Sequence, residues 1–239
     1  MEKSIAAEAY LYRDRLHHID MLEALRRKMA YIVYAGPEGV LLYNAMSECW
    51  VISAATPEAS LHMLAIPESP DFICAHQEFT VSQLQKTYDS PFFLDCVQTA
   101  YFKSDPVPVP SVCTFRAMEP GDAQWVNENY RNDPGELDYV RSLLEKGLIT
   151  GAYVNGRCAG FIGRHSEGSI GLLEVLPKYR RQGVGSALFR DALNRELQRG
   201  NIPFGQVEWG NEPSLALQRK TGCTVSEGHV YWMSLVPRQ

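Results

Sequence analysis

The stretch Arg180-Arg181-Gln182-Gly183-Val184-Gly185 lies between a predicted apolar strand and a predicted helix. Gly183 and Gly185 lack a Cβ atom, so the chain can turn tightly there and bring its N–H groups close to a ligand. The same N–H groups begin a helix, where unpaired donors and the helix dipole favour an anion. Lys178, Arg180 and Arg181 add positive charge. The stretch therefore predicts a binding site for a phosphate or pyrophosphate group.

Two familiar phosphate-binding patterns do not fit. A Walker loop requires Lys and then Ser or Thr after its second glycine, whereas the nearest candidate, Gly151 to Gly156, continues with Arg157-Cys158. The dinucleotide-binding fingerprint requires a third glycine, and Leu188 occupies that position. The alternative that remains is a helix start that carries two glycines and binds no ligand.

Hydrophobic periodicity and turn residues predict the elements around this loop. Residues 149–154 and 157–164 are predicted strands joined by Asn155-Gly156, which favours a type I′ hairpin. A third strand covers residues 169–176, and the helix after the loop ends at Arg199, before Gly200. The other elements predicted here are strands 113–116, 206–209 and 230–235, helix 213–220, and a helix opened by a capping box of Asp133, Pro134 and Glu136.

The loop resembles the pyrophosphate loop of the GNAT superfamily of N-acetyltransferases, which reads Q/R-x-x-G-x-G/A and is filled here by Arg180, Gly183 and Gly185. A second family motif, N-x-x-S/A-x-x-L-Y-x-x-x-G-F, is matched at Asn211, Ser214, Leu217 and Gly222. The resemblance covers residues 113–235 and implies an α/β (α+β) fold with a mixed, mostly antiparallel sheet flanked by helices. It also implies acetyl-CoA or another acyl-CoA as co-substrate.

The resemblance further implies which residues contact the cofactor. Backbone N–H groups at residues 182–186 would hold the diphosphate, and those near Val175 and Leu176 would stabilise the oxyanion of the reacting thioester. The implied CoA-binding residues are Val175, Leu176, Arg180, Arg181, Gln182, Gly183, Val184, Gly185, Ser186, Asn211 and Ser214.

Two positions depart from the family pattern. Gln218 stands where many members have the tyrosine that protonates the departing CoA thiolate. The layout is most similar to the glycine N-acyltransferase-like branch, which has an extra N-terminal half, but Ser169 occupies the position of that branch's basic glutamate. These departures motivate an alternative function, a catalytically inactive acyl-CoA-binding module or sensor.

Candidate catalytic groups must therefore be found elsewhere. Glu174 is the preferred base. A charged side chain within the apolar run from Leu172 to Leu176 is costly to bury, so it is expected either to form an ion pair or to serve in catalysis. A salt bridge with Arg164 is the structural alternative, and Glu167 and Glu208 are weaker candidates. Tyr231 is the candidate acid, with core packing or protonation by water as alternatives.

The run Asp105-Pro106-Val107-Pro108-Val109-Pro110 predicts an extended connector. It divides the chain into an N-terminal α/β domain (1–105), a linker (106–110) and an acetyltransferase domain (111–239). The first part is predicted to contain hairpin strands 31–35 and 40–43, a helix from Thr56, strand 71–75 and helix 81–88. We interpret this part as a degenerate copy of the same fold that forms one side of the acceptor pocket. Residues 1–110 contain 8 Lys and Arg against 14 Asp and Glu, a net charge of −6 that suits a cationic acceptor. The strand-to-helix junction at residues 76–80 has no glycine, which argues against a second CoA site.

Composition excludes several classes of protein. The net charge of −5 and a pI near 5.7 argue against nucleic-acid binding. No apolar run approaches the ~18–20 residues of a membrane helix, and the charged opening residues do not resemble a signal peptide, so we expect a cytoplasmic protein. Six separated cysteines predict no disulfide framework. Adjacent His17 and His18 would point to different sides of a helix, so no metal is expected.

The sequence thus predicts an acyl-CoA-dependent N-acetyltransferase. It would transfer an acetyl or short acyl group to the amine of a small molecule by direct attack on the thioester, and no motif fixes the oligomeric state.

Overall fold

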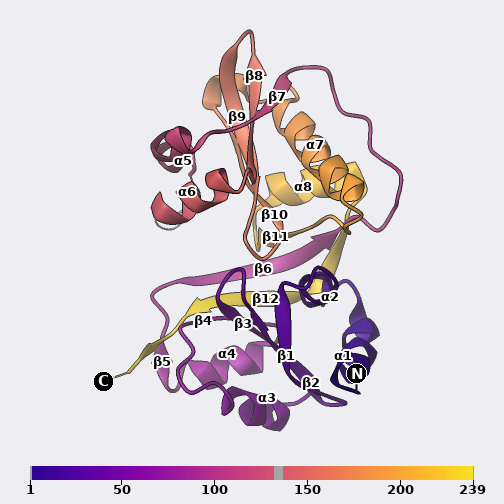
Figure 1. The fold of residues 1–239 in the computed structure, drawn as a ribbon, viewed down its shortest axis with the longest axis vertical. Coiled ribbons are helices and arrows are strands. Elements are labelled where there is room, and N and C mark those ends of the chain that lie inside the picture. The colour runs from indigo at the N-terminus through magenta and orange to yellow at the C-terminus, as the bar shows by residue number, and fades with distance from the viewer. Residues whose placement is uncertain (1, 132–136, 239) are drawn as a thin grey trace. The chain divides into compact units, whose positions relative to one another are not determined.

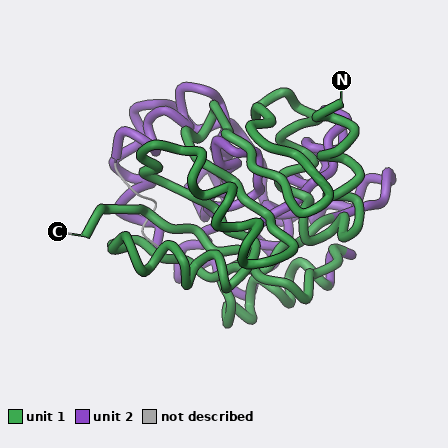
Figure 2. The backbone as a smooth tube through the Cα atoms, turned by 90° about the horizontal axis from the view of Figure 1, so that it is seen from below, with its two compact units in different colours: residues 1–100, 206–219, 223–239 green, residues 101–205, 220–222 purple. Residues whose placement is uncertain are grey.

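The structure is a computed structural model that describes residues 2–131 and 137–238. The chain forms two compact units, shown in different colours in Figure 2. Unit 1 contains residues 1–100, 206–219 and 223–239, and unit 2 contains residues 101–205 and 220–222. The predicted capping box of Asp133, Pro134 and Glu136 lies outside the described residues.

The larger sheet has seven strands in the order β1-β2-β3-β4-β12-β6-β11. Strands β3 and β4 pair in parallel, whereas the β1–β2, β2–β3, β4–β12 and β12–β6 pairs are antiparallel. The strands are β1 (Ala30–Gly36), β2 (Gly39–Asn44), β3 (Cys49–Ala54), β4 (Phe72–Ala75), β6 (Phe93–Ala100), β11 (Phe204–Glu208) and β12 (Thr224–Ser234).

Strand β12, yellow in Figure 1, lies between β4 and β6 in this sheet. Its residue Tyr231 is opposite Ala75 of β4 on one side and Asp95 of β6 on the other. This pairing places a strand from residues 224–234 among strands from the first hundred residues. The compact units therefore divide the chain differently from the predicted boundary at residues 106–110, which stays a prediction about domains.

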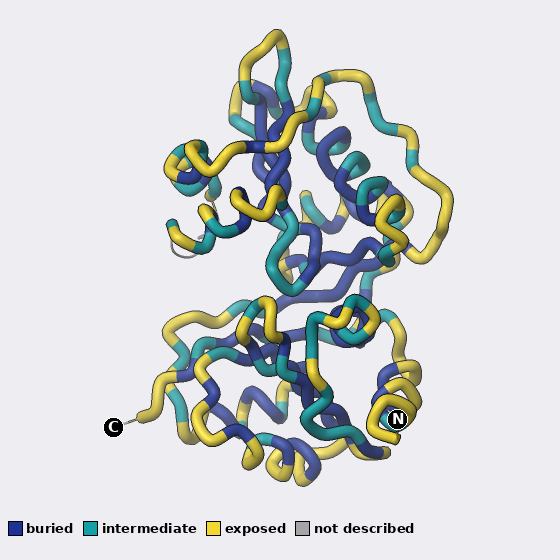
Figure 3. Tube along the Cα trace, in the orientation of Figure 1, coloured by how far each residue is buried: buried dark blue, intermediate teal, exposed yellow. Residues whose placement is uncertain are grey.

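Helices cover both faces of the sheet in unit 1. Neighbouring residues of a strand point to opposite faces, and both faces carry apolar side chains that pack against helices. Val40 and Leu42 of β2 pack in a cluster with residues of α1 (Glu2–Leu11) and α2 (Ile19–Arg26). Leu41 packs in a second cluster with residues of α3 (Pro57–Leu64) and α4 (Glu78–Leu84). Figure 3 shows the strands of this unit mostly as buried. Strands β5 (Tyr88–Asp89) and β13 (Val236–Pro237) form a separate two-stranded sheet.

Unit 2 contains an antiparallel four-stranded sheet in the order β10-β9-β8-β7. Strands β8 (Ile149–Val154) and β9 (Arg157–Arg164) have the bounds that the sequence predicts, and the positive φ angles of Asn155 (50°) and Gly156 (75°) confirm the tight turn between them. The other elements of unit 2 are β7 (Thr114–Ala117), α5 (Ala123–Asn129), α6 (Leu137–Glu145), β10 (Ile170–Val175) and α7 (Val184–Gln198). Helix α8 (Glu212–Thr221) belongs to unit 1 except for its last two residues. Short 3₁₀ turns are η1 (Tyr12–Asp14), η2 (Pro120–Asp122) and η3 (Pro177–Tyr179).

The proline-rich segment is tied down along α7. Asn194 accepts a hydrogen bond from the N–H of Val107 (2.8 Å) and donates one to its carbonyl (2.9 Å). Arg190 donates to the carbonyl of Pro108 at 2.9 Å. The segment is extended, as the prolines predict, but its backbone is paired with a helix of the same unit.

The predicted fold class, a mixed and mostly antiparallel α/β structure flanked by helices, is confirmed. The helix predicted at residues 81–88 is wrong in its bounds, because α4 begins at Glu78 and Tyr88 belongs to β5. All six cysteines are free thiols. Among the described residues, no helix has both the length and the apolar composition that crossing a bilayer would require.

The premise that His17 and His18 lie in a helix and point to different sides of it is wrong. Both residues lie in a turn between η1 and α2 rather than within a helix. Their rings are therefore close together, with centroids 5.1 Å apart.

Candidate functional site

The predicted phosphate loop connects the end of β10 to the start of α7. After η3 the chain passes through Arg181 (φ 61°) and Gly183 (φ 85°), both in the left-handed region that glycine adopts most easily. Gly183 is the N-cap of α7, and its position provides no side-chain cap for the helix. The α-helical geometry leaves the N–H groups of residues 184–186 without an intrahelical acceptor. These donors begin a helix of 15 residues, so they form a suitable anion site.

The two glycines have different local roles. Gly183 adopts a positive φ, and a Cβ there would meet only Val112, at 3.7 Å. Gly185 packs against the end of β10, where a Cβ would lie 3.3 Å from Cγ2 of Val175. One glycine therefore permits the turn, and the other lets the helix approach the strand.

Arg180 folds back onto the end of β10. Its Nε donates to the carbonyl of Val175 at 2.9 Å, and its Nη2 lies 3.2 Å from Oε1 of Glu174. The side chain of Arg180, a predicted CoA contact, thus already has acceptors at the end of β10. The positive charges left near the opening are those of Arg181, which is exposed, and Lys178, whose Nζ lies 5.0 Å from the centroid of the Tyr179 ring.

Glu174 is buried, with 9% of its surface exposed. The β9–β10 register shifts between Gly171 and Glu174, and Leu172 within this bulge has a φ of 51°. Such bulges redirect side chains, and they are frequent beside active sites. Gly160 of β9 permits the close approach, because a Cβ there would collide with the carbonyl oxygen of Glu174.

The suggested pairing of Glu174 with Arg164 is wrong. Arg164 lies 3.6 Å from Glu196 of α7, whereas Glu174 is paired with Arg180 and lies 4.0 Å from Arg131. The register shift in β10 turns the carboxylate toward the loop. Glu174 therefore links the strand end to the loop residue that folds back on it.

The two predicted oxyanion donors differ in their bonding. The N–H of Leu176 donates to the carbonyl of Ala159 in β9 at 2.9 Å, so it belongs to the sheet ladder. The N–H of Val175 donates to the side chain of Glu174 at 3.1 Å. A side chain can rotate away more easily than a strand can separate. Of the two amides, that of Val175 is the one that a ligand can take over.

Unit 2 thus brings together the predicted residues from Glu174 to Ser186, while Asn211, Ser214 and Tyr231 belong to unit 1. Asn211 Oδ1 accepts from the N–H of Ser214 at 3.2 Å, which caps the start of α8. Gln218 is buried, and its side-chain oxygen accepts a hydrogen bond from the Thr99 hydroxyl.

Tyr231 lines a cavity of about 550 Å³ in unit 1, together with His76, Gln77, Glu78, Phe79, Ser82 and His229. Burial, with the nearby carboxylates of Asp95 and Glu78, raises the pKa of Tyr231. The phenol therefore stays protonated at neutral pH, as an acid must.

Sequence reasoning missed a polar pair in this cavity. His229 Nδ1 and Asp95 Oδ1 are 2.6 Å apart on the adjacent strands β12 and β6. The ring of Trp209 lies against His229, with centroids 4.7 Å apart. No local signal in the sequence pairs these two residues, because both strands contain other polar residues and they lie more than a hundred residues apart.

Comparison with known proteins identifies the class of this fold. An X-ray structure of a Drosophila protein aligns over 100% of this chain and 97% of its own, with a TM-score of 0.66 and 16% identity. A putative GNAT-family acetyltransferase from Novosphingobium aromaticivorans covers 92% and 96% of the two chains, with a TM-score of 0.57 and 14% identity. A GCN5-related N-acetyltransferase from Kribbella flavida covers 93% and 96%, with a TM-score of 0.55 and 14% identity. The fold is that of GNAT acetyltransferases.

The sequence places this likeness in one part of the chain. Residues 114–222, just under half of the protein, match the acetyltransferase (GNAT) family. The segment includes the loop and both glycines, and it supports a transferase of the acetyltransferase type, for which CoA binding is typical. None of the curated proteins matches the chain. The likeness to the glycine N-acyltransferase-like branch stays a prediction.

Proposed function

We propose that this protein transfers an acetyl or other short acyl group from acyl-CoA to the amine of a small molecule. The observation that carries the proposal is the start of α7, where residues 184–186 present unpaired N–H groups behind the left-handed Gly183. A diphosphate bound there would be held by backbone donors and by the helix dipole. The family match over residues 114–222 supports acyl transfer as the chemistry.

The reaction in this proposal is direct. The amine nitrogen attacks the thioester carbonyl, the carbon–sulfur bond breaks, and CoA leaves as a thiolate. The N–H of Val175 would donate to the developing oxyanion after releasing Glu174, an interaction worth about 3 kcal/mol in comparable sites. Glu174, once released, would accept the amine proton directly or through a water molecule. Tyr231 or water would protonate the thiolate, whose ordinary pKa is about 8.5.

Gln218 supports a second candidate, an acyl-CoA-binding module without turnover. Its side chain cannot act as an acid, and its oxygen is already bound to Thr99. The two candidates share the CoA site and differ only in whether the thioester is consumed.

The test of turnover uses the full chain with acetyl-CoA and propionyl-CoA, a panel of small amines, and detection of the released thiol. Thiol release that depends on an amine supports the transferase. Binding of acyl-CoA by calorimetry without thiol release supports the binding module.

The test of the site compares two glycines of the same helix. Gly183→Ala adds a Cβ at the proposed diphosphate site, whereas Gly200→Ala adds one at the opposite end of α7, where φ is 72° and no atom lies within 4 Å. Both substitutions strain a positive φ by about 1 kcal/mol or more. We expect only Gly183→Ala to weaken CoA binding, by tenfold or more. Equal affinity in both variants would place the cofactor elsewhere.

A further inference from the structure

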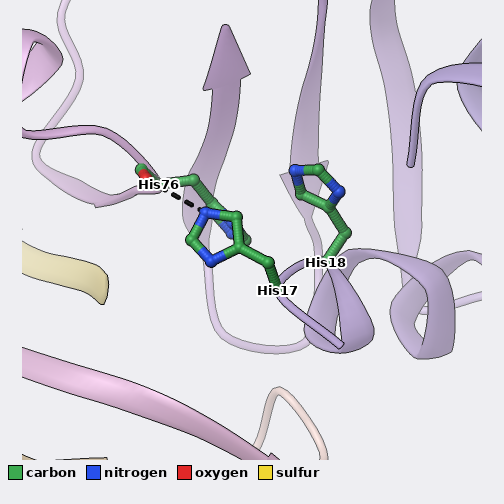
Figure 4. A group of neighbouring side chains, drawn as sticks. All are labelled: His17, His18 and His76. Carbon is green, nitrogen blue, oxygen red and sulfur yellow. Dashed lines mark hydrogen bonds between the residues drawn. The ribbon is translucent and has the colours of Figure 1, made fainter. Parts of the chain in front are cut away.

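Three buried histidines meet beneath the sheet of unit 1. His17 and His18 come from the turn before α2, and His76 follows the end of β4 (Figure 4). One ligating nitrogen from each ring lies within 4.8 Å of the other two. Residues 58 positions apart in the chain are thus brought together within unit 1, whereas the predicted CoA loop belongs to unit 2.

The hydrogen bonds of the rings indicate where their protons lie. His17 Nε2 faces the carbonyl of His76 at 3.1 Å, and His18 Nδ1 faces the carbonyl of Leu11 at 3.0 Å. A carbonyl only accepts, so each of these nitrogens carries the hydrogen and donates. His76 Nε2 lies 3.2 Å from Asp20 Oδ2, which likewise accepts. In the neutral rings, the opposite nitrogen of each histidine then carries a lone pair.

Two of these lone-pair nitrogens have no partner. His17 Nδ1 and His76 Nδ1 are buried without a hydrogen bond in the described structure, and His18 Nε2 contacts the Ser53 hydroxyl at 2.8 Å. Gly228 of β12 keeps space beside His17, because a Cβ there would lie 2.7 Å from Nδ1. Buried polar atoms normally have a partner, so each of these two nitrogens is a candidate ligand atom.

The charge of the cluster points to a cation. Asp20 is buried, and its Oδ2 accepts hydrogen bonds from His76 Nε2 at 3.2 Å and from the side chain of Gln206 at 3.4 Å. Burial lowers the pKa values of His17 and His18. Neutral imidazoles are the form that binds metals. A dication would compensate the buried carboxylate.

We propose that His17, His18 and His76 bind a divalent transition-metal ion, with Zn²⁺ as the probe. Imidazole nitrogens suit zinc and its neighbours in the first transition row. Metal-binding histidines usually donate their second N–H to a carboxylate or a backbone carbonyl, as all three rings do here. Zn–N bonds of about 2.0–2.1 Å require the nitrogens to move closer than 4.8 Å, so binding would rotate the rings.

Asp20 and Cys74 extend the cluster. Their ligating atoms lie within 4.8 Å of each other and of His76. Asp20 fixes the orientation of the His76 ring through Nε2, the nitrogen opposite the one left for the ion. The bound ion would tie the turn at residues 15–18 to the end of β4 and so stabilise unit 1.

The experiment removes metal from the full chain with a chelator and then titrates Zn²⁺ by calorimetry, with Co²⁺ absorption as an independent report of nitrogen ligation. We expect one ion per chain and a higher melting temperature with Zn²⁺. His17→Ala and His76→Ala should each weaken binding by at least 100-fold. Asp20→Asn, which keeps a hydrogen-bond acceptor, should weaken it by 10–100-fold. His62→Ala removes an exposed histidine of α3 and should change nothing.

The parent protein decides the matter even if a variant fails to fold. Chelator-treated chain that keeps its circular dichroism but takes up no Zn²⁺ or Co²⁺ overturns the proposal and leaves a hydrogen-bond network only. Binding that persists in folded His17→Ala and His76→Ala overturns it as well. Neither result bears on the proposed diphosphate loop at residues 182–186, which belongs to unit 2.

Discussion

The Nη2 atom of Arg180 lies 3.2 Å from Oε1 of Glu174, and Nε of the same arginine donates to the carbonyl of Val175. The residue that opens the glycine-rich loop is therefore bound to the end of the strand before it. We propose that Arg180 has a positioning role, in which its contacts with the strand end keep the loop amides in their direction.

A double-mutant cycle tests this role. Arg180→Ala should weaken CoA binding by about tenfold, or 1.4 kcal/mol, and Glu174→Gln should weaken it less because an amide still accepts a hydrogen bond. The double variant should bind no worse than Arg180→Ala, since both changes loosen the same contact. Calorimetric titration of CoA measures all four proteins. Additive losses would instead indicate that Arg180 contacts CoA itself.

Gly160→Ala tests the close approach of β9 and β10. A Cβ at Gly160 would collide with the carbonyl oxygen of Glu174 and lie 3.0 Å from Cα of Val175. We expect a loss of about 1–3 kcal/mol in the free energy of unfolding, measured in urea, because backbone atoms must move. Gly121→Ala is the matched control, because nothing lies within 4 Å of its added Cβ. A Gly160 variant as stable as the control would mean that the strands separate there at no cost.

The stability contributed by Glu23 should depend on pH. Burial alone would raise its pKa, but the guanidinium groups of Arg26 and Arg27 outweigh burial and lower it. A lowered folded pKa gives stability that is fully present above the unfolded value of about 4.3. That stability is lost as pH falls through the folded value.

The measurement compares the parent with Glu23→Gln. The variant should be about 2 kcal/mol less stable at pH 7, and the difference should shrink as pH falls below about 4. Glu68→Gln, at an exposed position, should match the parent throughout. A difference that stays constant with pH would show that the charge of Glu23 does not contribute.

The thiols should play no part in acyl transfer. Burial raises the pKa of Cys223 to about 12, and it also raises the pKa values of Cys113 and Cys158. Such thiols are poorly ionised at pH 8, so iodoacetamide should label the folded protein slowly and leave amine-dependent thiol release unchanged. In denaturant all six cysteines should react, because all are free. Rapid loss of activity at one equivalent of reagent would instead point to a cysteine intermediate.

Local signals in the sequence predicted much of unit 2. The bounds of β8 and β9 follow from Asn155-Gly156 between two alternating runs, and the loop follows from Gly183 and Gly185. In these cases a few adjacent residues fix the backbone, so a short window contains the information.

Contacts between distant segments were not predictable in the same way. Nothing near Arg180 shows that its side chain turns back to Glu174, because this depends on the register shift in β10. The meeting of His17 and His18 with His76 depends on how the turn before α2 packs against β4. Likewise, the pairing of His229 with Asp95 exists only because β12 lies beside β6.

The central position of β12 has a consequence for biosynthesis. Strands β4 and β6 are both translated long before residues 224–234, yet β12 is the neighbour that saturates their facing backbone groups. While the ribosome is still adding the second half, the nascent first half holds an open slot with two bare strand edges, which are prone to association with other chains. The sheet is completed only when nearly the whole polypeptide has emerged. Until then, chaperones must keep the incomplete sheet of the nascent chain from associating with other chains.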